Sequence, residues 1–215
     1  MSAARDAILG RIRRALADVP AEPAPPAERA FRRAGETGRD ALVEAFTERA
    51  RAYKVRVERA GPGEVAATVA RILGERGHVR LVVPVDLPAA FAPEGFDLVP
   101  DTGLDRAVPA GADGVVTGCA CAIAQTGTIV LDHGPGQGRR ALTLLPDYHL
   151  CIVEADRIVD LVPEAVARME PAVKAGRPLT FISGPSATSD IELSRVEGVH
   201  GPRRLDVVVV TSPEG

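Results

Sequence analysis

The chain has 215 residues, a length that suits one α/β domain with an extension or at most two small domains. Its apolar and charged fractions, 46% and 26%, are close to those of soluble globular proteins, so wholesale disorder is not expected. The formal net charge is −3, and there are five Phe, two Tyr and no Trp. This composition disfavours nucleic-acid binding, whether by overall charge or by aromatic stacking.

Arginine dominates the basic residues. Of the 26 basic side chains only Lys54 and Lys174 are lysines, which leaves 24 arginines. A biased genome base composition would explain most of this excess. Arginine is nevertheless the residue suited to forked pairing with carboxylates or phosphates.

The chain lacks long apolar runs, an apolar signal core and metal-binding cysteine motifs, and these absences guide the expected compartment and cofactors. No run of about 18 apolar residues occurs, and the first residues are charged, without an apolar signal core. Cys119, Cys121 and Cys151 form no secreted disulfide framework and contain no C-x-x-C pair, so they are interpreted as core thiols. We therefore expect a cytoplasmic protein with no membrane span and no metal site.

Residues 1–53 are predicted to form an N-terminal arm, which consists of a helix, a Pro-rich linker and a second helix. Residues 3–17 predict an amphipathic helix, because Ile8, Ile12, Leu16 and Val19 recur at helical spacing. Four prolines in residues 20–26 favour an extended linker, and a second helix is predicted over 39–52. Residues 1–60 hold 13 basic and 9 acidic side chains, whereas residues 61–215 hold 13 basic and 20 acidic side chains, so the front of the chain is basic and the rest is acidic. The arm is either a solvated extension or a docking element for a partner or a second copy.

From residue 54 to 215, predicted strands and helices alternate. Strands are predicted at 55–57, 81–83, 96–99, 114–124, 129–131, 149–153, 179–182 and 205–210, with helices at 62–73 and 163–169. Several strands are unalternated apolar runs, which is typical of parallel strands buried on both faces. A bend or hairpin is predicted at Gly127. The fold class is α/β, with three layers around a central, mostly parallel sheet.

Two glycine-containing motifs are candidate anion-binding sites. Thr126, Gly127 and Thr128 follow a predicted strand, where a glycine between hydroxyls exposes N–H donors; a tight turn without a ligand is the alternative. The loop 132–140 contains three glycines and then two arginines, so we expect it to be flexible. Its candidate ligand-binding residues are Gln137, Gly138, Arg139 and Arg140. The alternative is a surface loop whose arginines pair with nearby carboxylates.

A third motif follows the strand at 179–182. Its candidate ligand-binding residues are Ser183, Gly184, Ser186 and Thr188, because hydroxyls at a helix start can hold an anion. Ser189 and Glu192 fit a capping box. The charged residues nearby predict a structural network of arginines and carboxylates, formed by Asp190, Glu192, Arg195 and Arg203. His200 is a loop histidine, a candidate ligand-binding residue and a weak candidate for acid–base catalysis.

Residues 124–131, 137–147, 182–192 and 198–203 closely resemble the lactate-utilisation protein C family of LUD-domain proteins. The resemblance covers the chain from about residue 114 to the end. It implies a fold like those of ribose-5-phosphate isomerase, glucosamine-6-phosphate deaminase, CoA transferases and formyltetrahydrofolate cyclo-ligase. One departure is Gln125, where relatives often carry Glu, so covalent transfer through an acyl-carboxylate at this position is not expected.

The resemblance also implies a function. The family acts in oxidising L-lactate to pyruvate alongside two partner proteins, at least one of which carries iron–sulfur clusters. This chain would then be a non-redox subunit, with the clusters on its partners and none bound directly. Two alternatives stay open: a stand-alone enzyme or sensor for a small anionic ligand, and a structural scaffold held by arginine–carboxylate pairs. Homo-oligomers are also possible.

Overall fold

The computed structural model describes residues 3–19, 30–103, 107–185 and 201–211. It divides into two units, Met1–Phe31 and Arg32–Gly215, which are described separately. The first contains helix α1 (Ala3–Ala15), within the predicted range, and none of its residues is buried. No helix in the described ranges is long and apolar enough to cross a membrane.

Helix α2 (Arg39–Ala52) has the predicted bounds, but it belongs to the second unit. Leu42, Val43, Phe46 and Ala50 are buried in a core cluster with residues of the sheets. The second helix of the predicted arm, residues 1–53, thus contributes its apolar face to the core rather than facing water.

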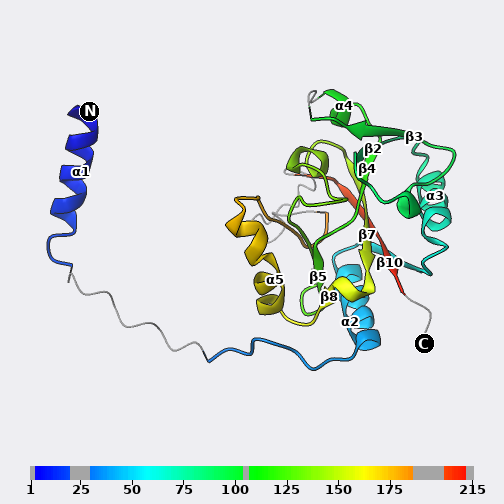
Figure 1. Ribbon diagram of the computed structural model, residues 1–215, viewed down its shortest axis with the longest axis horizontal. Helices are drawn as coiled ribbons and strands as arrows, with labels where there is room; N and C mark the ends of the chain where they lie inside the picture. The colour runs from blue at the N-terminus through cyan, green and yellow to red at the C-terminus, as the bar shows by residue number, and fades with distance from the viewer. Residues whose placement is uncertain (1–2, 20–29, 104–106, 186–200, 212–215) are drawn as a thin grey trace. The chain divides into compact units, whose positions relative to one another are not determined.

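The main sheet has six strands, and every pairing in it is parallel. Its spatial order is β1 (Arg56–Ala60), β10 (Arg204–Val210), β7 (Tyr148–Glu154), β4 (Gly114–Thr117), β2 (Arg80–Pro84) and β3 (Asp97–Asp101). In β10, Val208 packs in the cluster that contains helix α3 (Val65–Arg76), whereas Val207 packs with α2. The three-layer α/β prediction is thus confirmed, and Figure 1 shows α3 and α2 on opposite faces.

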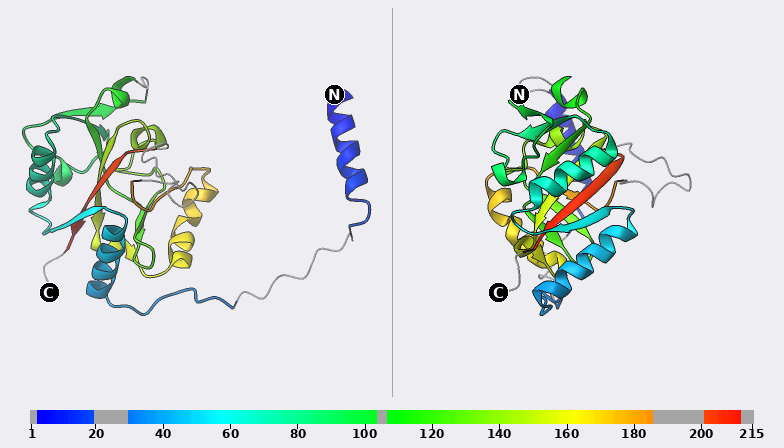
Figure 2. Two further views of the ribbon diagram at one scale, coloured as in Figure 1. Left: turned by 180° about the vertical axis from the view of Figure 1, so that it is seen from behind. Right: turned by 90° about the vertical axis from the view of Figure 1, so that its right-hand side faces the viewer.

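A second, four-stranded sheet forms part of the layer beside α2. Its order is β8 (Ile158–Val159), β5 (Cys121–Ile123), β6 (Thr128–Leu131) and β9 (Thr180–Ile182). Strands β5 and β6 form the hairpin predicted at Gly127, which has a φ of 64°. Helix α5 (Val162–Lys174) packs against this sheet through Ala165 and Met169. Figure 2 shows the helix, in yellow, beside the strands of this sheet.

Short elements complete the described part of the second unit. They are the helix α4 (Ala107–Ala110) and the 3-10 turns η1 (Ala89–Phe91), η2 (Arg140–Thr143) and η3 (Ala155–Arg157).

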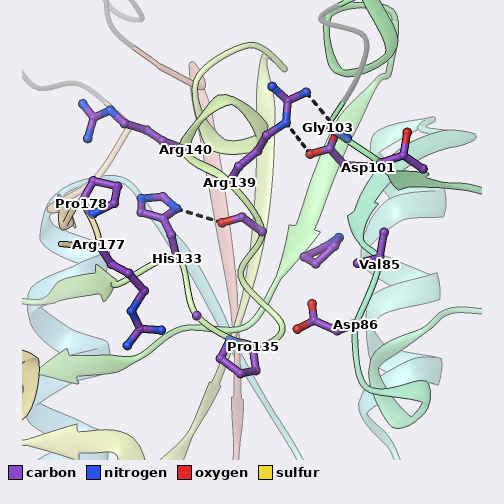
Figure 3. Close-up of a pocket in the computed structure, with 14 residues that line it drawn as sticks. Val85, Asp86, Asp101, Gly103, His133, Pro135, Arg139, Arg140, Arg177 and Pro178 are labelled. Atoms are coloured by element: carbon purple, nitrogen blue, oxygen red, sulfur yellow. Dashed lines mark hydrogen bonds and ion pairs between the residues drawn. The ribbon is translucent and has the colours of Figure 1, made fainter. Parts of the chain in front are cut away.

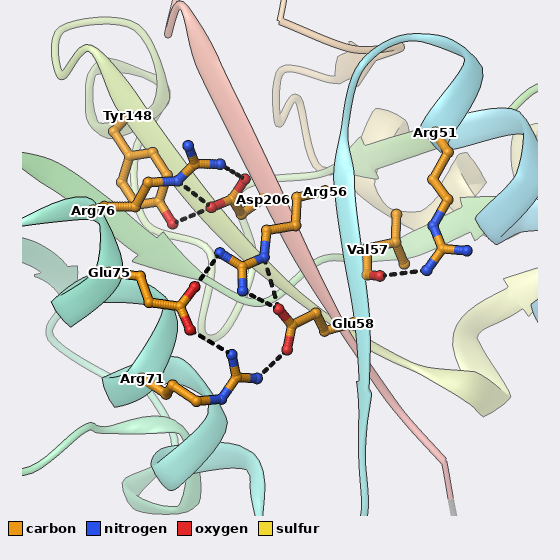
Figure 4. Close-up of polar contacts among 9 residues, drawn as sticks. All are labelled: Arg51, Arg56, Val57, Glu58, Arg71, Glu75, Arg76, Tyr148 and Asp206. Atoms are coloured by element: carbon orange, nitrogen blue, oxygen red, sulfur yellow. Dashed lines mark hydrogen bonds and ion pairs between the residues drawn. The ribbon is translucent and has the colours of Figure 1, made fainter.

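Forked arginine pairs join α3 to the main sheet. Arg76 donates to both oxygens of Asp206, at 3.0 and 2.8 Å, and the Tyr148 hydroxyl donates to Asp206 at 2.9 Å. The Asp206 side chain is only 1% exposed, so these bonds satisfy a buried carboxylate. Arg56 and Arg71 bridge two glutamates beside this cluster (Figure 4). Some of the arginine excess therefore serves the fold.

Candidate functional site

A cleft of about 610 Å³ opens at the carboxyl ends of β2 and β3, which end at Pro84 and Asp101. Its other wall is the loop 133–140 that follows β6, together with Arg177 and Pro178 after α5 (Figure 3). Open parallel sheets commonly bind their ligands at this end of the strands. The cleft is therefore the candidate functional site.

Arg139 lines the cleft but is committed to a carboxylate. Its Nε and Nη2 atoms donate to Asp101 at 2.7 and 2.9 Å, and the Asp101 side chain is 5% exposed. Hydrogen bonding to Asp101 raises the pKa of Arg139, so the guanidinium stays charged. Of the two predicted roles for this arginine, carboxylate pairing is the one that the structure displays.

Arg140 is oriented differently, and Figure 3 shows the two guanidinium groups diverging. Its Nη1 donates to the Thr180 hydroxyl at 3.0 Å, and among the described residues it has no ion pair. His133 Nε2 lies 2.9 Å from the same hydroxyl, and His133 Nδ1 donates to the Gly138 carbonyl at 2.9 Å. The Thr180 hydroxyl thus joins Arg140 and His133 by hydrogen bonds at the cleft.

The loop 132–138 is held by internal bonds, contrary to the flexibility expected from its glycines. Gln137 is buried, donates to Asp132 Oδ1 at 2.7 Å and accepts from the Asp132 backbone N–H at 2.8 Å. Arg177 donates to Asp132 Oδ2 at 2.8 Å, while its Nε is buried and has no hydrogen-bond partner among the residues that the structure describes. Gln137 therefore supports the wall of the cleft, and an unsatisfied arginine donor lies beside it.

The hydroxyl motif lies at the opposite end of β6 from the cleft. Thr128 bonds both Thr126, at 2.7 Å, and Ser183, at 2.8 Å. Gly127 is close to α2, where an added Cβ would lie 2.7 Å from the Ala50 nitrogen. Leu131 pairs with Thr180, which bonds His133 at the cleft, whereas Thr128 lies three residues, roughly 10 Å, further along the strand. These hydroxyls and Gly127 therefore do not line the cleft.

Several predicted residues lie elsewhere or outside the described ranges. Gly184 packs against Tyr53, and Arg203 pairs with Asp147 at 2.8 Å on the surface. The predicted residues outside the described part of the chain are Ser186, Thr188, Asp190, Glu192, Arg195 and His200. Of the predicted ligand-binding set, the cleft is lined by Gly138, Arg139 and Arg140.

The structure adds residues to the site that the sequence did not single out. His133 adopts a φ of 54°, which is uncommon outside glycine, and the loop around it accommodates this backbone. Arg177 follows Gly176, a positive-φ residue just after α5, and Asp101 ends a strand. The Gly-rich sequence around His133 was the one local feature that could have indicated this histidine as a site residue. Arg177 and Asp101 lie near His133 only because the fold brings these distant segments together.

The cysteines are core residues, as predicted, with exposed fractions of 0–1%. A hydrogen bond with Cys151, together with burial, raises the pKa of the Cys119 thiol well above its usual value. Burial raises the pKa of Cys121 to about 12. Both groups are therefore protonated thiols near neutral pH. Among the residues that the structure describes, no cluster of three His, Cys, Asp or Glu side chains is arranged to hold a metal.

Gln125 lies beside the start of α5. Its Oε1 accepts from the backbone N–H of Val162 at 3.4 Å, and its own N–H donates to the Asp160 carbonyl at 3.0 Å. The side chain thus assists the first turn of α5 and is not part of the cleft lining.

Comparisons with known proteins agree with the sequence motifs. The LUD domain family model matches residues 104–210. The chain is 44% identical to lactate utilization protein C of Deinococcus radiodurans over 204 residues, covering 94% of this chain and 93% of the relative. It is 38% identical to lactate utilization protein C of Halalkalibacterium halodurans over 92 residues, covering 41% of this chain and 40% of that relative. A crystal structure of a DUF162 family protein from Deinococcus radiodurans matches with a TM-score of 0.71 and 40% identity, covering 81% of this chain and 99% of that chain.

Proposed function

The chain belongs to the LUD-domain family that includes lactate utilization protein C, and on that basis we propose that it acts in lactate utilisation. Its part would be that of a non-redox subunit that binds a small anionic ligand, alongside partners that oxidise L-lactate. The similarity to the Deinococcus radiodurans relative supports the role, because it extends over almost the full length of both chains.

The cysteines support a non-redox role. Iron–sulfur clusters are held by thiolates, whereas Cys119 and Cys121 are buried and have raised pKa values. Cys151 contacts Cys119 within the same core cluster. Thiols in this environment pack the interior, so the electron-transfer centres of the system would be on partner proteins.

One observation carries the anion-binding part of the proposal, namely the environment of Arg140. Two other cations line the cleft, Arg139 and Arg177, and each already has a carboxylate partner. Arg140 has only the Thr180 hydroxyl among the described residues, so its remaining donors are available to a ligand. Charge-assisted bonds from a guanidinium to a carboxylate or phosphate are among the stronger hydrogen bonds in proteins.

Calorimetric titration of the full-length protein with inorganic pyrophosphate tests the cleft. We expect Arg140→Gln to weaken binding about tenfold, the loss of one charge-assisted bond. Arg59→Gln is the matched control, since Arg59 is an exposed arginine outside the cleft. Unchanged affinity in the Arg140 variant would refute binding at this site.

A second candidate function has one observation in its favour. The cleft lies at the carboxyl ends of parallel strands, where stand-alone α/β enzymes bind their substrates. Purification of the tagged chain from its own cells grown on L-lactate separates the two functions. Recovery with an iron–sulfur protein supports the subunit, and recovery of the chain by itself supports the stand-alone enzyme or sensor.

A further inference from the structure

Helix α1 carries an apolar stripe on its surface. Ile8, Ile12 and Leu16 are 48–55% exposed, and no residue of the helix is buried. The helical bonding continues to Leu16, whose backbone N–H donates to the Ile12 carbonyl at 3.0 Å. At about 100° of rotation per residue, the three side chains lie within about 80° of the helix circumference. None of them lines the cleft, so the function proposed above makes no use of this stripe.

The charge of α1 is positive and borders the stripe. Residues 3–15 include four arginines and one aspartate, which gives a net charge of +3. Arg11 and Arg13 flank Ile12, each rotated by about 100° from it in opposite directions. Long arginine side chains at such positions lie along an apolar surface while their guanidinium groups reach charged groups beside it. The helix therefore presents aliphatic side chains between two cations.

The length of α1 limits what can cover the stripe. The helix has 13 residues and is roughly 20 Å long, shorter than the roughly 30 Å hydrocarbon core of a bilayer. It would therefore lie along a surface rather than cross a membrane. An isolated helix of this length is only marginally stable in water, so a surface that accepts the stripe would also stabilise the helix.

The side chains of α1 favour a lipid surface over a protein groove. A stable protein interface buries about 800 Å² on each partner and commonly depends on large aromatic anchors. Residues 3–15 contain no aromatic side chain and offer a stripe of a few aliphatic ones. A lipid surface requires no complementary shape, because binding depends on the apolar area that enters it and on the attraction between basic side chains and anionic headgroups.

From these observations we propose that α1 binds the surface of an anionic membrane and lies in its plane. Ile8, Ile12 and Leu16 enter the boundary between headgroups and acyl chains, and Arg11 and Arg13 contact lipid phosphates on either side. The acidic residues 61–215, with 13 basic and 20 acidic side chains, are repelled by the same surface. The attachment is therefore reversible and depends on α1.

Co-sedimentation of the full-length protein with vesicles tests the proposal. The vesicles contain phosphatidylcholine alone, or phosphatidylcholine and phosphatidylglycerol at about three to one. We expect at least tenfold tighter binding to the anionic vesicles, because each arginine near such a surface contributes about fivefold. This preference should disappear in about 1 M salt, which shortens the range of charge interactions to about 3 Å.

Two double variants test the role of the arginines. Arg11→Gln with Arg13→Gln should weaken binding to the anionic vesicles about 25-fold, at about fivefold per arginine. Glutamine has nearly the helix propensity of arginine, so the helix itself is little affected. The matched control is Arg80→Gln with Lys174→Gln, which removes two exposed cations of the second unit and should bind as the wild type does.

Tryptophan fluorescence reports which face of α1 meets the lipid, because the natural chain contains no Trp. Ile12→Trp places the indole in the stripe, and its emission should shift to shorter wavelength with anionic vesicles. Gly10→Trp is the matched control, about 160° away from Ile12 on the helix, and its emission should stay unchanged. An added Cβ at Gly10 has only the end of the Arg14 side chain within 4 Å.

Three results would overturn the proposal. They are equal binding to neutral and anionic vesicles, equal loss in the two double variants, and equal emission shifts at the two Trp positions. Sedimentation equilibrium without lipid adds a fourth, because a dimer that Ile12→Ser dissolves, together with no binding to vesicles, would assign the stripe to a second copy of the chain instead.

Discussion

Arg139 holds Asp101 through two parallel hydrogen bonds, of 2.7 and 2.9 Å, across the cleft between two segments 38 residues apart. The next residue, Arg140, bonds a hydroxyl instead. Two adjacent arginines therefore have different roles. The first ties the end of β3 to the Gly-rich loop, and the second is left with donors for a ligand.

Arg139→Ala should lower the free energy of unfolding by roughly 1–3 kcal/mol, because it leaves a nearly buried Asp101 carboxylate without its partner. Urea denaturation measures the change. Arg140→Ala is the matched variant and should stay within about 0.5 kcal/mol of the wild type. Equal losses in both variants would contradict the division of roles.

Gly127→Ala should destabilise the protein by about 2 kcal/mol or more. The residue has a positive φ, and a Cβ would lie 2.7 Å from the Ala50 nitrogen of α2. Gly63→Ala is the control, since a Cβ there has no atom within 4 Å. Thermal denaturation of both variants compares them, and a neutral Gly127 variant would mean that the hairpin does not pack on α2 as described.

The burial of His149 predicts that the free energy of unfolding falls in mild acid. It is fully buried, its Nε2 lies 2.8 Å from the Thr117 hydroxyl, and burial lowers its pKa from 6.5 to about 4. The unfolded chain therefore binds a proton that the folded chain does not between these pH values. Stability from this group is complete above pH 6.5 and falls by about 3 kcal/mol as the pH drops towards 4.

Denaturant melts of the wild type and of His149→Gln, taken between pH 7.5 and 4, test this effect. Carboxylate titrations contribute to both proteins, so the difference between the two curves isolates the histidine. We expect the wild type to lose its stability more steeply than the variant across this range. Parallel curves would show that His149 is not buried as a neutral ring.

The sequence was most informative where one physical signal dominated. Helix α2 had its predicted bounds because its apolar face repeats at helical spacing, and β10 was evident from its run of valines. The division into two sheets was not predicted. Strands β6 and β9 are short apolar runs like the others, and only their tertiary pairings place them in a separate antiparallel arrangement.

The candidate site was predictable only in part. Arg139 and Arg140 were found because a Gly-rich loop precedes them, but their different partners depend on Asp101 and Thr180, which are distant in sequence. The hydroxyls of Thr126 and Thr128 resembled an anion site locally, yet they bond one another and Ser183 at the far end of β6. A sequence motif can identify hydrogen-bond donors, but the partners of those donors depend on the tertiary fold.

Growth on L-lactate as the sole carbon source tests the central claim most directly, in cells from which this gene has been deleted. We predict no growth after deletion, restoration by the wild-type gene or Arg59→Gln, and poor restoration by Arg140→Gln expressed at the same level. Normal growth of the deletion strain on L-lactate would contradict a role in lactate utilisation, and full restoration by Arg140→Gln would contradict the role of the cleft.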